Sequence, residues 1–493
     1  MRRPISIPST ALATLLAALA LLPLLGHKPL TDWDEAIYAE ISREMLHGSW
    51  LVSHWNYQIW LEKPPLLLWI NAIFFKLFGV TEFWARAASA LSGVAIVGLL
   101  HRWLARSRDT LTAWLSTAIL LATFGFLHAC HTGETDVLLS LGCIIALLGL
   151  AQIDDANLNG WWSFWIGFAI AVMTKGAAAV VLPLTAILFA AIQRWRPDRL
   201  RAPFYLGLAL FLAFVLPWHL AMLHLFGGQF LNQYLGFHVL ARATRQIEGH
   251  TTPWWFYFKV LLVSAPPFSL LYPFALADGL RRRNLRAWAV FSLVVIAFYT
   301  AVQTRLPQYI VPAYPALSVL TAAWLAGRLR PMLAARRPAG YWVKLGLAVS
   351  ALAIAAVWLT TPARKSLHSA TLADGTILPD NKDSIALLRD ASRHPLPTVP
   401  GPLLLWRHDR IMSIATDVFY SRRQVEQVEL TLPPPGTPTD PYTYNPQLLD
   451  QAVTAEPRLI LLDRSLIPCL PSYFTYASID SYGAMELGSI ARR

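Results

Sequence analysis

The stretch PPLLLWINAIFFKLFGV (residues 64–80) decides how this chain is threaded across a membrane. It is apolar but short, and it carries Lys76 in its second half. A transmembrane helix needs about 20 predominantly apolar residues, so this stretch falls short of a full span. If it did cross, every later loop would change sides.

The rest of the chain has the composition of a polytopic membrane protein. Of its 493 residues, 55% are hydrophobic and only 14% are charged, and the mean hydropathy is +0.45. Soluble proteins carry about 25% charged residues. Candidate spans lie near residues 7–26, 84–104, 110–129, 137–153, 160–173, 177–193, 203–224, 258–278, 287–303, 308–327 and 341–360.

The first candidate span resembles a signal peptide but is not followed by a small-residue cleavage pattern. We therefore expect it to be retained, with Arg2 and Arg3 in the cytoplasm. The chain is predicted to be an α-helical polytopic membrane protein of about 11 to 13 transmembrane helices.

Arginine-rich segments settle the question raised by residues 64–80. Four of them separate apolar spans: 101–109, 194–201, 280–286 and 327–337. The positive-inside rule places all four in the cytoplasm, and this works only if 64–80 does not cross. We therefore predict one outer excursion over 28–83, with juxtamembrane helices. The formal charge of +12 is then explained by membrane anchoring, and no nucleic-acid partner is predicted.

The composition changes after residue 360, where prolines and charges become frequent. A helix-like stretch at 383–391 and short apolar runs at 401–407 and 457–463 predict a small α/β domain over 361–493. The proline-rich segment 433–446 reads as a loop inside it. Residues 1–360 are predicted to form the membrane domain, and both the outer excursion and the C-terminal domain are expected on the outer side.

Carboxylates gather where the topology places outer loops. In TDWDEAIYAEISREML (31–46), Asp34 and Glu35 start a helical pattern, although an N-cap role for Asp32 or Asp34 remains an alternative. Glu62 and Asp136 lie close to other apolar segments. Acidic residues so near hydrocarbon are costly and usually functional.

Basic residues are expected on the same side as these carboxylates. A carboxylate that accepts a proton, beside cations that hold a departing phosphate, suits group transfer from a phosphate-linked donor. A donor carried on a membrane lipid would explain a site at the interface. The cations concerned are Lys63, Lys175, Arg242, Arg245 and Arg305.

Five stretches together resemble the integral-membrane GT-C glycosyltransferases that use polyprenyl-phosphate sugars. They are WDEAIYAEISREM, YQIWLEKPPLLLWINAIFFKLFG, GETDVLL, MTKG and LPQYIVPAYPAL, in this order along the chain. More narrowly, residues 28–327 look like bacterial relatives of the lipid A aminoarabinose transferase and of the protein O-mannosyltransferases.

The resemblance implies a catalytic set of Asp34, Glu35 and Asp136. Asp34 would activate or orient the acceptor for attack on the anomeric carbon, in a single displacement with inversion. It also implies lipid-phosphate binding by Lys63, Arg242 or Arg245, Arg305 and Tyr309.

A divalent ion is a further implication of the resemblance. Glu62, His238 and His250 resemble positions that can hold one, but the spacing of the histidines matches no compact metal motif, and satisfied interfacial histidines are an equal alternative. Two departures concern the donor sugar. Ile37 stands where arginine is common, and Arg305 stands where lysine is common.

The implied function is transfer of a sugar from undecaprenyl phosphate, or a related polyprenyl phosphate, to lipid A, another envelope glycan or a protein. The implied location is the bacterial inner membrane, with the active site in the periplasm. A transporter of a polyprenyl-phosphate sugar is the alternative. Transfer releases free polyprenyl phosphate, whereas transport leaves the donor intact.

Overall fold

The fold is taken from a computed structural model. It describes residues 7–31, 33–241, 244, 252–334, 382–391, 401–406, 415–427, 452–453, 455–470 and 472–492. Contacts divide the chain into two compact units. We call residues 1–27 and 61–377 the bundle unit, and residues 28–60 and 378–493 the sheet unit.

This division differs from the boundary expected at residue 360. Segment 28–60 was expected with the membrane domain, but its contacts are with the C-terminal part of the chain. Hydrogen bonds join the two pieces, for example from the backbone N–H of Leu30 to the Tyr420 hydroxyl at 2.9 Å.

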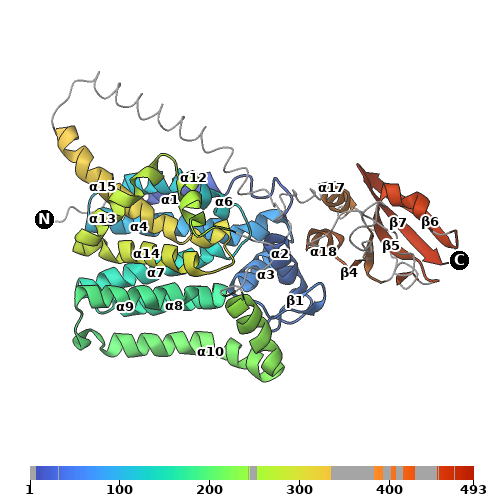
Figure 1. Ribbon diagram of the computed structural model, residues 1–493, viewed down its shortest axis with the longest axis horizontal. Helices are drawn as coiled ribbons and strands as arrows, with labels where there is room; N and C mark the ends of the chain where they lie inside the picture. Colours follow the sequence, from blue (N-terminus) through green and yellow to red (C-terminus); the bar gives the residue numbers. More distant parts are fainter. Residues whose placement is uncertain are drawn as a thin grey trace, which may run out of the picture. The chain divides into compact units, whose positions relative to one another are not determined.

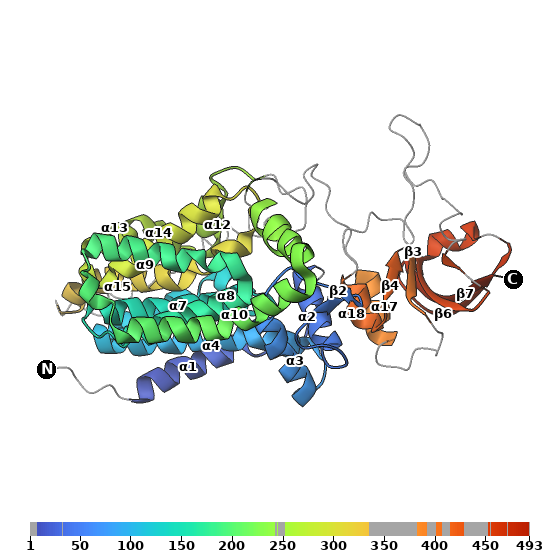
Figure 2. The same ribbon diagram turned by 90° about the horizontal axis from the view of Figure 1, so that it is seen from below.

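Long helices running side by side make up the bundle unit (Figures 1 and 2). Its α-helices are α1 (Ile7–Leu21), α3 (Leu66–Phe78), α4 (Glu82–Ser107), α5 (Thr110–Leu121), α6 (Phe124–Cys130), α7 (Asp136–Asp154), α8 (Gly160–Lys175), α9 (Val181–Gln193), α10 (Ala202–Phe230), α12 (Phe256–Ser264), α13 (Tyr272–Arg281), α14 (Arg286–Ala301) and α15 (Ala313–Ala334). Short helical turns η1 (Gly176–Val180) and η6 (Pro307–Ile310) and a π-helix η3 (Leu231–Ala241) connect them.

Within the described residues, five helical stretches are long and apolar enough to cross a membrane, or six if the bent pair α5–α6 counts as one span. The protein is therefore a helical polytopic membrane protein, as predicted, although this measure gives fewer spans than the eleven to thirteen expected. Helix α3 is among the shorter apolar helices. Helix α1, which is expected to cross, is also among them, so the non-crossing of 64–80 stays a prediction.

Several expected spans are broken, which explains much of the lower count. The first helix ends at Leu21 rather than near residue 26, where Pro23 and the left-handed Leu24 (φ 67°) interrupt it. Helices α5 and α6 meet at 69°. The span expected at 258–278 is divided between α12 and α13, and the one expected at 341–360 lies outside the described residues.

Helices α8 and α9 belong to one apolar stretch that folds back on itself. The end of α8 reaches the start of α7 through Lys175 and Asp136, while the end of α9 reaches the end of α7 through Gln193 and Asp154. The two helices are therefore antiparallel, as the sequence predicted for 160–173 and 177–193.

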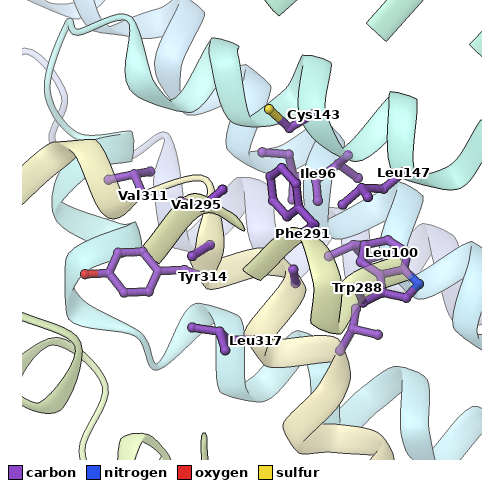
Figure 3. Close-up of a cluster of buried hydrophobic side chains, with 14 of the residues drawn as sticks. Ile96, Leu100, Cys143, Leu147, Trp288, Phe291, Val295, Val311, Tyr314 and Leu317 are labelled. Atoms are coloured by element: carbon purple, nitrogen blue, oxygen red, sulfur yellow. The ribbon is translucent and has the colours of Figure 1, made fainter. Parts of the chain in front are cut away.

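The core of the bundle lies where α4 and α7 meet α14 and α15, and Figure 3 shows their side chains packed there. Trp288 and Phe291 of α14 are both 0% exposed. Helices α7 and α8 approach so closely that a Cβ at Gly142 would lie 2.6 Å from the carbonyl oxygen of Gly167. Small residues permit such backbone contact between membrane helices. This contact brings the two helices together along their length.

A mixed five-stranded sheet forms the C-terminal part of the sheet unit, in the order β4-β3-β5-β7-β6. Strands β3 (Leu403–Trp406), β4 (Val425–Gln427) and β5 (Arg458–Asp463) are parallel, and β6 (Phe474–Tyr482) and β7 (Met485–Arg492) are antiparallel to their neighbours. Helix α17 (Lys382–Ala391) contacts β6 and β7, α18 (Ala415–Ser421) packs against α17, and α2 (Asp34–Glu44) packs against α18. A hairpin of β1 (His54–Trp55) and β2 (Gln58–Ile59) completes the unit.

The predictions for the C-terminal region agree with these elements where the structure describes them. Helix α17 covers the stretch expected to be helical at 383–391, and β3 and β5 cover the two apolar runs. All four residues of β3 are buried, as a continuous apolar run in a central parallel strand requires. The loop expected at 433–446 lies outside the described residues.

Candidate active site

One end of the helical bundle gathers the arginine-rich segments. Asp154, at the end of α7, accepts from Gln193, Trp195 and Arg283 at 3.0–3.1 Å. Asp109, at the start of α5, pairs with Arg330. We call this the arginine end.

The arginine end unites all four basic segments of the sequence. Arg108 donates to Asn284 at 2.5 Å, which links the first segment to the third. Arg199 of the second donates to the carbonyl of Ile153 beside Asp154. The expectation that these segments share one side of the membrane is therefore matched by their positions, while the side itself remains a prediction.

The opposite end of the bundle holds a buried ion pair. Lys175, the last residue of α8, places Nζ 2.6 Å from a carboxylate oxygen of Asp136, the first residue of α7. Their side chains are 12% and 3% exposed. Because α7 and α8 are antiparallel, their sequence positions bring these two charges together at what we call the Asp136 end.

Burial makes this pair costly as a purely structural element. Removing two charges from water carries a penalty that their attraction offsets only with good geometry and further hydrogen bonds. A carboxylate also sits well at a helix N-terminus, as Asp136 does, because the helix dipole favours negative charge there. Charged groups retained in such a place usually serve function.

Aromatic residues form one wall of the Asp136 end. Lys175 Nζ lies 4.7 Å from the centre of the Tyr309 ring, in cation–π contact. Tyr309 in turn lies 5.3 Å, centre to centre, from Tyr299. The Tyr299 hydroxyl is buried and has no hydrogen-bond partner within the described part of the chain. Such a hydroxyl at the edge of a charged site is a candidate substrate contact.

Arg305 serves the backbone at this end. It is 7% exposed and donates to the carbonyl oxygens of Thr300 (2.8 and 3.1 Å) and Thr252 (2.6 Å). These bonds fasten the segment after residue 251 to the end of α14. The proposed contact of Arg305 with a lipid phosphate would use guanidinium N–H groups that do not take part in these three hydrogen bonds.

The other residues expected to bind phosphate or metal are only partly described. Lys63 and Glu62 are half-buried, directly before α3 in the bundle unit. Arg242, Arg245 and His250 lie outside the described residues, as does the side chain of His238. Among the side chains that the structure does describe, no group of three His, Cys, Asp or Glu residues could hold a metal ion.

Asp34 and Glu35 begin helix α2 in the sheet unit and have different surroundings. Glu35 is 1% exposed, and its carboxylate accepts from the backbone N–H and the hydroxyl of Thr31, at 2.6 and 2.8 Å. Asp34 is half-buried and accepts from the Tyr38 hydroxyl at 2.8 Å. Glu35 thus closes the turn that precedes the helix, and Asp34 is the more accessible carboxylate.

Backbone strain marks the residue before Asp34. Trp33 has φ 71° and ψ −135°, in a region that bulky residues rarely occupy. Such strain costs about 1–3 kcal/mol and concentrates at functional sites. It supports a functional reading of Asp34 over a simple capping role, because the N-cap residue is Trp33 and makes no side-chain capping bond.

The structure thus brings Asp136 and Tyr309 together within one unit, whereas Asp34 and Glu35 belong to the other unit. Lys175 was among the cations named from the sequence, but it had no assigned role. Its position at the end of one span, next to a span that begins with Asp136, was a usable signal for their pairing. Tyr299 was missed, because nothing in its apolar surroundings distinguishes it.

Comparisons with known proteins find similar sequences. The family model described as dolichyl-phosphate-mannose-protein mannosyltransferase matches residues 62–220. The undecaprenyl phosphate-alpha-4-amino-4-deoxy-L-arabinose arabinosyl transferase of Pectobacterium carotovorum is 32% identical over 372 residues, which are 72% of this chain and 66% of that relative. The chain thus spans just under two thirds of that relative's length.

Solved structures share the fold. ArnT from Cupriavidus metallidurans, bound to undecaprenyl phosphate, superposes with a TM-score of 0.74 at 20% identity, and 98% of each chain is covered. The apo oligosaccharyltransferase of Archaeoglobus fulgidus has a TM-score of 0.52 at 12% identity and covers 85% of this chain and 64% of that one.

The fold is the GT-C architecture that the solved ArnT structures share, built in a helical polytopic membrane protein. Within that class, the chain belongs to the family described as dolichyl-phosphate-mannose-protein mannosyltransferase, among the relatives of the aminoarabinose transferases.

Proposed function

We propose that this protein transfers a sugar from undecaprenyl phosphate to an acceptor at the outer face of the bacterial inner membrane. The observation that carries the proposal is the buried Asp136–Lys175 pair beside Tyr309, at the end of the bundle opposite its four arginine-rich segments. The names of the similar arabinosyl transferases and the ligand of the similar ArnT structure support the donor lipid.

Asp34 acts on the acceptor in this proposal. Its carboxylate accepts the acceptor's hydroxyl proton as the acceptor oxygen attacks the anomeric carbon. The bond from that carbon to the phosphate oxygen breaks, so the sugar is transferred with inversion and undecaprenyl phosphate leaves. For Glu35 we propose a role in supporting the helix start, since one of its carboxylate oxygens accepts two hydrogen bonds from Thr31.

Positive charge stabilises the departing phosphate. Lys63, Arg242, Arg245 and Arg305 remain the proposed cations, and Tyr309 remains a proposed phosphate contact. The cation–π contact between Lys175 and Tyr309 adds Lys175 to this group. Stabilising charge that develops in the transition state is usually the largest electrostatic contribution to catalysis. Asp136 holds Lys175 in place and carries the second negative charge of the site.

The acceptor and the orientation complete the proposal. Lipid A, another envelope glycan and a protein hydroxyl are the proposed acceptors, and each would meet the same carboxylate, that of Asp34. The arginine end is proposed to face the cytoplasm. The Asp136 end and the sheet unit would then face the periplasm.

The test is a transfer assay in lipid vesicles with a radiolabelled undecaprenyl-phosphate sugar and a membrane extract as acceptor. We expect the native protein to release free undecaprenyl phosphate and label the acceptor. Asp34→Asn should lower transfer by about 100-fold or more, because the amide cannot take the proton. Glu35→Gln serves as the neighbouring control and should mainly affect stability.

Two outcomes would overturn the proposal. Equal transfer by the native protein and Asp34→Asn would leave Asp34 without a catalytic role. Movement of intact donor across the bilayer, with no release of undecaprenyl phosphate for any acceptor, would identify a transporter.

A further inference from the structure

The hairpin that follows α2 in the sheet unit has an unusual turn. Asn56 and Tyr57 join β1 to β2 and both have left-handed backbones, with φ 52° and 60°. Two left-handed residues between paired strands form a type I′ turn, in which asparagine is favoured at the first position. The turn therefore presents the Asn56 side chain in a defined direction.

Asn56 binds the edge of the C-terminal sheet. Its side-chain nitrogen donates to the carbonyl oxygen of Val425 at 3.0 Å, and its side-chain oxygen accepts from the backbone N–H of Val425 at 2.9 Å. Val425 begins β4, an edge strand of the sheet. One carboxamide thus takes the place of a neighbouring strand and satisfies an edge residue in both directions.

Further hydrogen bonds tie the segment around α2 to the same domain. The Tyr57 hydroxyl donates to the carbonyl of Arg422 at 3.1 Å, and the Leu30 N–H donates to the Tyr420 hydroxyl at 2.9 Å. Leu30 precedes α2 and Tyr57 follows it. The C-terminal domain therefore holds the chain on both sides of the helix.

The turn is also tied directly to α2. The Tyr57 backbone N–H donates to both carboxylate oxygens of Glu44 at 3.1 Å, and Arg43 donates to the Tyr57 hydroxyl at 3.0 Å. Any displacement of the turn is therefore passed to the last turn of the helix whose first residue is Asp34. We call Asn56, Tyr57 and their partners on residues 422 and 425 the clasp.

We infer that the C-terminal domain positions the helix carrying Asp34 through this clasp, with Asn56 as the positioning residue. The inference rests on the proposed role of Asp34. Asn56 contacts neither substrate nor reacting atoms in this account. It acts by fixing α2, since misplacing a catalytic group by about 1 Å can cost about 100-fold in rate.

Asn56→Gly tests the clasp with little backbone disturbance, because glycine accepts the left-handed conformation. Asn56→Asp keeps the oxygen that accepts from Val425 but places a carboxylate oxygen against the Val425 carbonyl. The matched control is Thr475→Ala, which removes one side-chain bond to the Ala491 carbonyl elsewhere in the same sheet.

We expect Asn56→Gly and Asn56→Asp to lower kcat for sugar transfer about tenfold or more, with KM for the donor lipid unchanged within about twofold. Hydrogen exchange of the peptide covering residues 34–44 should become faster in both variants. Thr475→Ala should change neither measurement. A kcat for Asn56→Gly equal to that of Thr475→Ala would overturn the inference.

Two further variants keep the outcomes separable. If Asn56→Gly does not fold, Tyr57→Phe is the test, because it removes only the hydroxyl bonds of the clasp. It should lower kcat by a smaller factor, with KM for the donor lipid unchanged. Full kcat in Tyr57→Phe would then contradict the inference. If Asp34→Asn stays active, the proposed function fails. If Asp34→Asn is inactive while the clasp variants are fully active, only the inference fails.

Discussion

The two ends of the helical bundle use charge in opposite ways. At the arginine end, the pair between Arg330 and Asp109 has side chains that are 50% and 32% exposed. At the Asp136 end, a single lysine and a single aspartate are buried together. Both arrangements contain ion pairs, but water screens only the first.

This difference separates anchoring from catalysis. An exposed pair such as Arg330–Asp109 is worth about 0–1 kcal/mol, so the arginine end does not depend on that pair. A buried pair depends on both partners, because either one alone would be an uncompensated charge. The Asp136 end is therefore where single substitutions should have the largest consequences.

Accessibility from the two sides of the membrane should distinguish the ends completely. In a Cys469→Ser background, Asn159→Cys marks the arginine end and Pro253→Cys, next to the Thr252 bound by Arg305, marks the Asp136 end. The other two native cysteines, Cys130 and Cys143, are buried. We expect a membrane-impermeant thiol reagent to label only Pro253→Cys in cells with a permeabilised outer membrane. Labelling of Asn159→Cys alone would reverse the proposed orientation.

Breaking the buried pair should have the next largest effect. Asp136→Asn leaves Lys175 buried without its partner and should cost about 3–5 kcal/mol of stability, with transfer lowered by about 100-fold or more. Asp109→Asn, at the exposed pair, should cost within about 1 kcal/mol. Thermal unfolding and the transfer assay measure both.

A double variant distinguishes structural from functional roles of the pair. Asp136→Leu combined with Lys175→Met replaces the ions by apolar groups and should recover much of the lost stability. Transfer should remain lost. Recovery of transfer in the double variant would show that the pair only holds the fold together.

Removing the unpartnered hydroxyl at the Asp136 end should have a smaller effect. Tyr299→Phe is expected to lower transfer about tenfold while leaving stability equal or higher, because a buried unpaired hydroxyl costs about 1–3 kcal/mol. Thr321→Val is its control, since Thr321 also lacks a partner for its buried hydroxyl within the described chain. Equal activity of both variants would remove Tyr299 from the site.

The smallest predicted effect is a pH dependence that comes from Glu44, a buried carboxyl group in the sheet unit. Burial and then nearby Glu40 raise the pKa of Glu44 from its ordinary 4.5 to about 8. The folded state thus favours the protonated form, and this contribution to stability is complete below about pH 4.5 and lost as pH rises through about 8.

Protection of residues 34–44 against hydrogen exchange, corrected for intrinsic rates, should therefore fall a few-fold as pH rises through this window. Glu44→Gln keeps an oxygen for the Tyr57 N–H and should flatten the dependence. The same slope in the native protein and in Glu44→Gln would assign the dependence to another group.

Much of the bundle could be predicted because its signals are local. Apolar runs located most helices, and the four arginine segments predicted a shared end. The structure assembles that end around Asp109 and Asp154. Asp136 and Lys175 were both recognisable as charges at the ends of neighbouring antiparallel spans, although their pairing required the structure.

The sheet unit was less predictable because its contacts are remote in sequence. Asn56 and Val425 are 369 positions apart, and no periodicity links them. Segment 28–60 was assigned by proximity in sequence to the membrane domain, whereas hydrogen bonds assign it to the C-terminal part. The breaks between α5 and α6 and between α12 and α13 also lie within continuous apolar runs, where hydropathy does not register a bend.

The length of α8 has a consequence for the surrounding lipid. Its 16 residues rise about 24 Å, while the hydrocarbon layer of a typical bilayer is about 30 Å thick. Ile166, midway along α8, is 43% exposed and available to acyl chains. Lipid beside this helix would have to thin to keep Lys175 at the headgroup level. Bilayer thickness would then control the rate of sugar transfer. Transfer should slow in vesicles made from lipids with progressively longer acyl chains. A transfer rate independent of acyl-chain length would argue against such a mismatch.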